Sequence, residues 1–174
     1  MPNELEQLKI ELTREIEKRI HEHEHDGNQA TQVKYHDIFN EAPSEIQLRP
    51  ATIAVAAGNN DDYVIAPIAG QLYQIDFSAV DALAASDTNY ITWTITNLGQ
   101  AGAGTTAMLA ATDANTTKAT GGTAISANTK RSLVISTALN AGGVIRGDRL
   151  LIRAAVTGTL ANTVTFPTYL LRFR

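Results

Sequence analysis

Residues 90–97 read Tyr-Ile-Thr-Trp-Thr-Ile-Thr-Asn, and residues 149–157 read Arg-Leu-Leu-Ile-Arg-Ala-Ala-Val-Thr. In both stretches every second side chain is apolar, which is the period-two pattern of a β-strand with one buried face. The predicted inward-facing residues are Ile91, Trp93, Ile95, Leu150, Ile152, Ala154 and Val156. These two stretches place the chain in the mainly β class.

Further strands are expected around these two. Residues 73–79 alternate in the same way, with Tyr73 as the first inward-facing residue. Shorter strand candidates lie at 52–57, 63–67, 107–111, 133–138 and 164–173. In the last of these the inward set changes parity around Pro167, which indicates a bulge or an edge position. Turn-forming clusters separate the candidates, at 58–62, 99–104, 121–122 and 142–143.

About eight short strands without an intervening helical pattern predict an antiparallel β-sandwich over residues 51–174. Jelly-roll-like and immunoglobulin-like sandwiches both fit this pattern. The chain contains no cysteine, so it lacks the Cys-Trp-Cys framework of antibody domains. The jelly roll is therefore the preferred fold.

An α-helix is expected ahead of the β domain, within an N-terminal segment of residues 1–20. Asn3 and Glu6 fit a capping box at its start. Its apolar residues recur at steps of three or four and share one face, namely Leu5, Leu8, Leu12, Ile16 and Ile20. Such a narrow stripe suits a short coiled coil between copies of the chain, with packing on its own domain as the alternative. These five residues are the predicted oligomerisation residues.

A linker over residues 21–50 carries all four histidines of the chain. His21, His23 and His25 occupy alternate positions, so in an extended segment they share one face. If three helices associate, two histidines per chain would surround the axis with six imidazoles, an octahedral nitrogen site for iron, nickel or zinc. A polar linker that binds no metal is the alternative.

Composition narrows the function classes. The first 26 residues hold eight acidic and four basic side chains, while residues 27–174 hold ten of each. A neutral body argues against nucleic acid as a partner. Apolar runs are too short to span a membrane, and the acidic start is unlike a secretory signal. We therefore expect a protein made in the cytoplasm, with no membrane partner.

Catalytic candidates are few, because residues after Pro50 include neither histidine nor cysteine. The carboxylate pairs Asp61 with Asp62 and Asp76 with Asp81 are the remaining candidates for acid–base chemistry. The tripeptide at residues 146–148, Arg-Gly-Asp, matches a cell-adhesion motif but leads directly into a predicted strand, which is ordinary turn chemistry.

Residues 23–27 (His-Glu-His-Asp-Gly) and 33–38 (Val-Lys-Tyr-His-Asp-Ile) resemble a linker found in many structural proteins of tailed bacteriophages. That linker joins a His-x-His-(Asp/Thr)-Gly turn to a hydrophobic-x-Tyr-x-(Asp/Asn)-Leu/Ile segment, commonly between an N-terminal coil and a β domain. This chain departs from it at residues 29–31 (Gln-Ala-Thr), where Asn-Ser is frequent, and by its extra His21. The β body is also similar to small virion domains. The resemblance implies a homotrimeric virion component made in the host bacterial cytoplasm.

Three functions are consistent with these features. The first is a non-enzymatic capsid decoration or head-fibre protein that docks on the shell, with the major capsid protein or another virion protein as partner. The second is a tail-fibre or receptor-binding protein that recognises a host surface glycan, for which Tyr63 is the best-placed aromatic residue. The third is a small hydrolase that uses paired carboxylates. The short chain favours the first, because receptor-binding fibres usually need a longer shaft.

Overall fold

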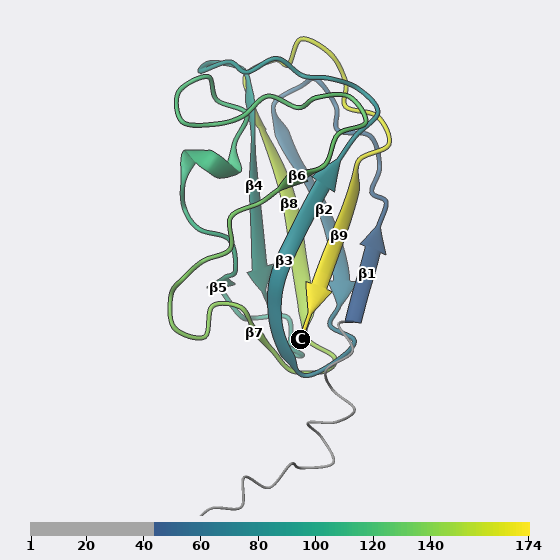
Figure 1. Cartoon of the computed structure of the whole chain (residues 1–174), viewed down its shortest axis with the longest axis vertical. Coiled ribbons are helices and arrows are strands. Elements are labelled where there is room, and N and C mark those ends of the chain that lie inside the picture. Colours follow the sequence, from purple (N-terminus) through teal and green to yellow (C-terminus); the bar gives the residue numbers. More distant parts are fainter. Residues whose placement is uncertain (1–43) are drawn as a thin grey trace, which may run out of the picture. The chain divides into compact units, whose positions relative to one another are not determined.

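The computed structural model describes residues 44–174, which form a body of β-strands and loops (Figure 1). In chain order its elements are β1 (Ser44–Leu48), β2 (Gly58–Ile65), β3 (Gly70–Ser78), β4 (Tyr90–Asn97), β5 (Thr106–Ala107), the 3₁₀ turn η1 (Asp113–Asn115), β6 (Arg131–Ser132), β7 (Gly143–Val144), β8 (Arg149–Thr157) and β9 (Thr168–Phe173). The predicted helix and the predicted histidine site lie outside the described residues. No helix within residues 44–174 is long and apolar enough to cross a membrane.

The strands form two antiparallel sheets. The first sheet has the order β1-β9-β3-β6, with β7 paired to one end of β3, and the second has the order β2-β8-β4-β5. The pairings are nested along the chain, with β1 on β9, β2 on β8, β3 on β6 and β4 on β5. Two further pairings, β3 with β9 and β4 with β8, join these nested pairs into the two sheets.

The core lies between the facing sides of the two sheets. Trp93 of β4 donates a hydrogen bond from Nε1 to the hydroxyl of Tyr169 on β9, at 3.0 Å. The ring of Phe77 on β3 lies 4.9 Å from the Trp93 ring and 5.2 Å from the Tyr169 ring. The inward-facing residues predicted on β4 and β8 are all buried, which confirms the alternation there. Aromatic contacts and one buried hydrogen bond therefore fix how the sheets face each other.

The predicted alternation is wrong at the start of β3. Leu72 is fully buried there, whereas Tyr73 is only partly buried. The pairing of β3 with β9 shifts register between Leu72 and Gln74, so one extra residue changes the parity of the strand. From Ile75 onward the predicted inward set is buried.

The turn predicted at residues 58–62 is also wrong, because these residues form most of β2 and pair along β8. The Asn and Asp side chains that suggested a turn lie on an edge strand, where solvent reaches them. Residues 44–48, placed in the linker by sequence, form β1 and pair with β9. Their alternating burial shows that the β body begins before residue 51.

At several positions predicted as strands, the chain forms isolated β-bridges instead. Ile53 and Val164 form one isolated bridge, and Leu109 and Ile135 form another. Pro167 does not lie on an edge strand, because β9 begins after it and lies between β1 and β3. The parity change arises one residue earlier, at Phe166, whose φ is +48°.

Candidate functional site

The adjacent acids Asp61 and Asp62 differ in their surroundings. They are neighbours on β2, so their side chains point to opposite faces of the sheet. Asp61 accepts two hydrogen bonds from Arg153 of β8, at 2.6 and 2.7 Å, and these bonds hold its pKa below the usual value. Burial, together with the charge of Asp61, raises the pKa of Asp62. The second carboxylate that a hydrolase needs is thus held in an ion pair with Arg153.

Asp76 and Asp81 have separate partners. Asp81 accepts hydrogen bonds from the backbone N–H and the hydroxyl of Thr165, and these bonds lower its pKa. Asp76 belongs to a cluster on the outer side of the first sheet, 3% exposed despite its position there. These two acids fix local structure in different parts of the chain, and within residues 44–174 no hydrogen bond joins them to a common partner.

The Asp76 cluster combines hydroxyl, amide and cationic groups around one carboxylate. Asp76 accepts hydrogen bonds from Ser132 Oγ at 2.6 Å, Gln74 Nε2 at 2.8 Å and Arg172 Nη1 at 2.9 Å. Lys130 Nζ lies 3.6 Å from it. Burial alone would raise the pKa of Asp76, but the hydrogen bonds and the two cations outweigh that effect and lower it.

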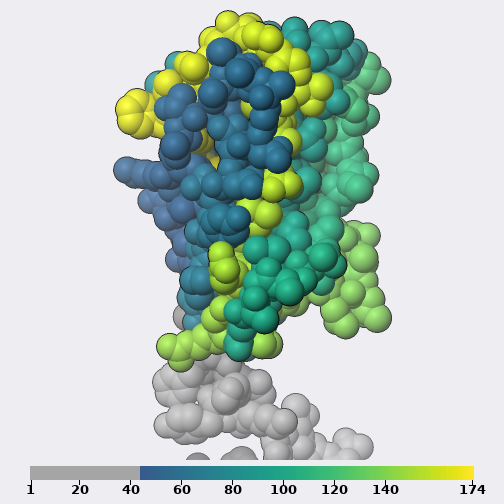
Figure 2. Space-filling model, turned by 180° about the vertical axis from the view of Figure 1, so that it is seen from behind, coloured from purple at the N-terminus to yellow at the C-terminus, as the bar shows by residue number. Residues whose placement is uncertain are grey.

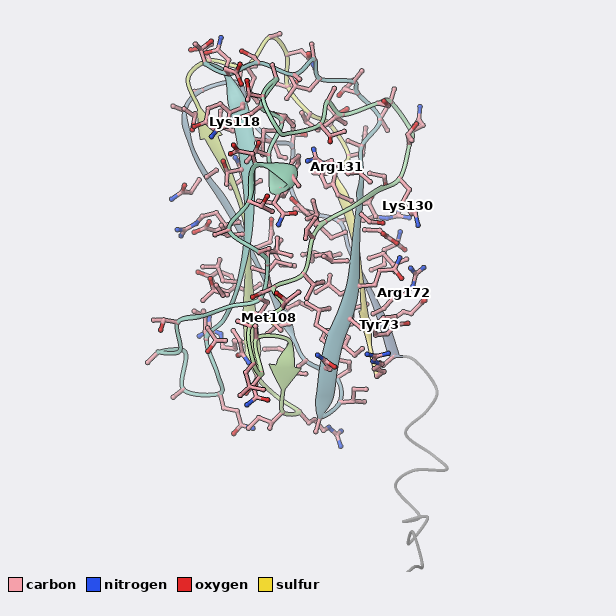
Figure 3. All side chains as sticks on the ribbon, turned by 60° about the vertical axis from the view of Figure 1, so that its left-hand side comes forward. Tyr73, Met108, Lys118, Lys130, Arg131 and Arg172 are labelled. Atoms are coloured by element: carbon pink, nitrogen blue, oxygen red, sulfur yellow. The ribbon has the colours of Figure 1, made fainter. Side chains whose placement is uncertain are left out.

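Arg131 lies on the opposite side of β6 from this cluster, between the sheets. Figure 3 shows Arg131 reaching into the interior, while Lys130 and Arg172 lie along the outer side of the sheet. Its guanidinium donates hydrogen bonds of 2.7 Å to the carbonyls of Ala114, Thr116 and Thr123, and it lies 4.7 Å from the centroid of the Trp93 ring. Burial lowers the pKa of Arg131 to about 10, so it stays charged at neutral pH. Arg131 therefore ties residues 114–123 to the core.

The Arg-Gly-Asp tripeptide is part of a turn that leads into β8. Asp148 is buried, and its Oδ2 accepts hydrogen bonds from Asn97 Nδ2 at 2.9 Å and from the Ile145 N–H at 3.0 Å. Gly147 has a φ of +95°, which suits glycine. A carboxylate held in this way is not displayed to a receptor, so the turn interpretation is confirmed.

The aromatic residues occupy two different settings. Trp93 is buried, as its alternation predicted. Tyr63 is half exposed on the outer side of β2, and the guanidinium of Arg149 lies 5.2 Å from its ring centroid. A more exposed aromatic residue, Phe166, escaped the sequence analysis. The parity change around Pro167 was the only sequence signal for it.

Phe166 lines a pocket of about 410 Å³ close to the end of β3 and the start of β9. These two strand ends lie side by side in the upper part of the body in Figure 1. We call this cavity the Phe166 pocket, and its lining includes Arg49, Ser78, Val80, Asn128, Phe166 and Thr168. The Phe166 side chain is 75% exposed. In the rear view of Figure 2, yellow atoms from the C-terminal part of the chain protrude at the upper edge of the body.

A second pocket, of about 430 Å³, lies beside β4 and residues 107–118. Its cation and its acid, Lys118 and Asp113, pair with each other at 2.8 Å. Across residues 44–174, no group of three or more histidine, cysteine, aspartate or glutamate side chains is placed to hold a metal ion. Comparison with known protein families, with characterised proteins and with solved structures finds no match to this chain.

Proposed function

We propose that the protein is a non-enzymatic structural component of a tailed-phage virion, a decoration or head-fibre protein that docks on the capsid. The observation that carries this proposal is the linker at residues 23–38 immediately ahead of a β body. Two of the candidate catalytic carboxylates, Asp61 and Asp76, are held in ion pairs with arginine, which favours a structural role. A catalytic acid needs a raised pKa, whereas the pKa of Asp61 and of Asp76 is lowered. Asp62, whose pKa is raised, has the ion-paired Asp61 as its neighbour.

The body is, in this proposal, a jelly roll. A jelly roll can be built by rolling up one long antiparallel hairpin, so its early strands pair with its late strands in nested order. The nested pairs β1 with β9 and β2 with β8 have this relation, as do β3 with β6 and β4 with β5. Rolling then places β9 beside β3 and β8 beside β4, which accounts for the two sheet orders.

The direct test is whether the protein is part of the phage particle. When the genome that encodes the chain produces phage, the chain is expected in the particle band of a density gradient, in a copy number that is a multiple of three. Quantitative mass spectrometry of the band measures the presence of the chain and its copy number per particle. Recovery of the chain only in the soluble fraction would overturn the virion role.

The trimer is tested separately by native mass spectrometry of the full chain at neutral pH. We expect a mass of three chains plus one transition-metal ion, and loss of the ion when a chelator is added or when the pH falls through the histidine pKa near 6.5. A monomer would contradict the trimer. A trimer without metal would remove the histidine site and leave the seam, which is the predicted coiled-coil contact through Leu5, Leu8, Leu12, Ile16 and Ile20.

Two variants separate the seam from the metal. Leu12→Glu puts a charge in the predicted seam and is expected to give monomers. Replacing His21, His23 and His25 together by alanine is expected to remove the ion while the mass stays that of three chains. Leu12→Asn is a milder control for the seam, since one polar residue is tolerated in a coiled coil at a cost in stability.

The second candidate function is a tail-fibre or receptor-binding protein that recognises a host glycan. One observation favours it over the hydrolase, namely the exposed Phe166 at the rim of a pocket.

A further inference from the structure

The backbone of Phe166 adopts a conformation that bulky residues avoid. Its φ of +48° lies in the left-handed region, where the side chain of an L-residue crowds the following carbonyl. Asn128, with a φ of +54°, lines the same pocket. Two of the three non-glycine residues with positive φ in residues 44–174 thus meet at one place. Backbone strain of this kind concentrates at functional sites.

The chain on both sides of Phe166 is held firmly, so the strained conformation is imposed by its surroundings. Val164 exchanges backbone hydrogen bonds with Ile53, at 3.0 and 3.1 Å. The Thr165 N–H donates to Asp81 at 2.7 Å, and the Thr165 carbonyl accepts from the Val80 N–H at 3.2 Å. On the other side, Thr168 enters β9. These contacts present an exposed aromatic ring without covering it.

Polar and cationic groups accompany the ring in the same pocket. Ser78 and Thr168 supply hydroxyl groups, and Asn128 supplies an amide, all able to donate and accept hydrogen bonds. Among the described residues that line this pocket, Arg49 is the only charged one and none carries a carboxylate. In the second pocket, beside β4, the cation Lys118 is paired with Asp113 at 2.8 Å.

We propose that the Phe166 pocket binds a saccharide that carries a carboxylate. The C–H face of a pyranose ring packs on the negative face of an aromatic ring, for which Phe166 is the platform. The hydroxyl groups of the sugar then meet Ser78, Asn128 and Thr168, and the guanidinium of Arg49 pairs with the carboxylate. The volume of about 410 Å³ is within the range of small-ligand pockets. A capsid protein and a tail protein could both carry such a site, so this proposal does not depend on the virion role.

Calorimetric titration of the full chain tests the site with three probes: oligogalacturonate, oligomannuronate and oligosialate. Each is matched with a counterpart whose carboxylates have been reduced to alcohols. We expect at least one acidic probe to bind with a Kd on the order of 1 mM, and its reduced counterpart to bind about tenfold more weakly. Added salt should weaken binding of the acidic probe only. No binding of any acidic probe at tenfold higher concentration would overturn the proposal.

Variants assign the binding to the pocket. Phe166→Ala and Arg49→Gln are each expected to weaken binding of the acidic probe about tenfold, and Arg49→Gln should not change binding of the reduced probe. Leu139→Ala is the matched control, because Leu139 is 93% exposed and lies outside the pocket. Unchanged binding by Phe166→Ala, or an equal loss in Leu139→Ala, would overturn the assignment.

Phe166→Asn separates loss of binding from loss of folding. Asparagine tolerates the left-handed region, so this variant should bind the acidic probe about tenfold more weakly, as Phe166→Ala does, while its Tm rises by about 3 °C. An unfolded Phe166→Asn would contradict the strain on which the proposal rests. Failure of every sugar to bind would leave the particle experiment above unaffected.

Discussion

Replacing Arg131 by alanine is expected to lower the free energy of unfolding by about 3 kcal/mol. The guanidinium forms three hydrogen bonds of 2.7 Å to backbone carbonyls and lies 4.7 Å from the centroid of the Trp93 ring. Alanine removes all of these contacts and leaves the carbonyls of Ala114, Thr116 and Thr123 without this donor. Urea unfolding followed by fluorescence measures the change, since Trp93 is the only tryptophan in the chain.

Two matched variants show whether the loss comes from these contacts. Lys130→Ala removes the neighbouring cation, whose side chain is 63% exposed, and should cost less than about 1 kcal/mol. Arg131→Lys keeps the charge near Trp93, but a lysine ammonium lacks the planar fork of donors that reaches three carbonyls. We therefore expect a loss of unfolding free energy between those of the other two variants. Equal losses for Arg131→Ala and Lys130→Ala would contradict the anchoring role of Arg131.

Asp76→Asn is expected to cost about 2 kcal/mol at pH 7. The substitution preserves the shape of the side chain but removes the charge that faces Arg172 at 2.9 Å and Lys130 at 3.6 Å. Because the pKa of Asp76 is below its ordinary value of 3.8 in the folded protein, the stability from this carboxylate is fully present above pH 3.8. It is lost as the pH falls through the folded pKa.

The difference between the parent protein and Asp76→Asn should therefore shrink when urea unfolding is repeated at decreasing pH below 3.8. Asp113→Asn is the control, since Asp113 also pairs with a cation, Lys118, but at the surface. We expect it to cost less than about 1 kcal/mol at pH 7. A difference for Asp76→Asn that stays constant down to pH 2 would show that the charge contributes nothing.

The parts of the fold that could be predicted are those in which one face of a strand is buried without interruption. On β4 and β8, burial follows strict alternation from Ile91 to Ile95 and from Leu150 to Val156. Prediction failed at Tyr73, where a bulge changes the parity, and in the first part of β2, where an edge position allows the polar residues 59–62. Both failures depend on partner strands that are distant in sequence.

The candidate pocket was less predictable than the fold. Arg49, Asn128 and Phe166 come from three separate parts of the chain, and only the sheet order brings them together. The positive φ of Phe166 has no signature in residue type, because phenylalanine rarely adopts it. The parity change before β9 marked the irregularity without indicating that an aromatic side chain is exposed there.

The position of β9 has a consequence for how the protein is made. β9 follows every other described strand in the chain, yet it lies between β1 and β3. The pair Ser44 with Phe173 joins residues at opposite ends of the described body. Such distant pairing is slow to form and leaves strand edges exposed in the meantime.

While a ribosome is still making residues 158–167, β1 and β3 have no strand to lie between them. The inner face of β3, with Ile75 and Phe77, is then only partly enclosed. A chain released early would expose this surface and two open strand edges, which invite aggregation and proteolysis. Synthesis must reach Phe173 before the first sheet can close, so prematurely ended copies would lack the strand that joins β1 to β3.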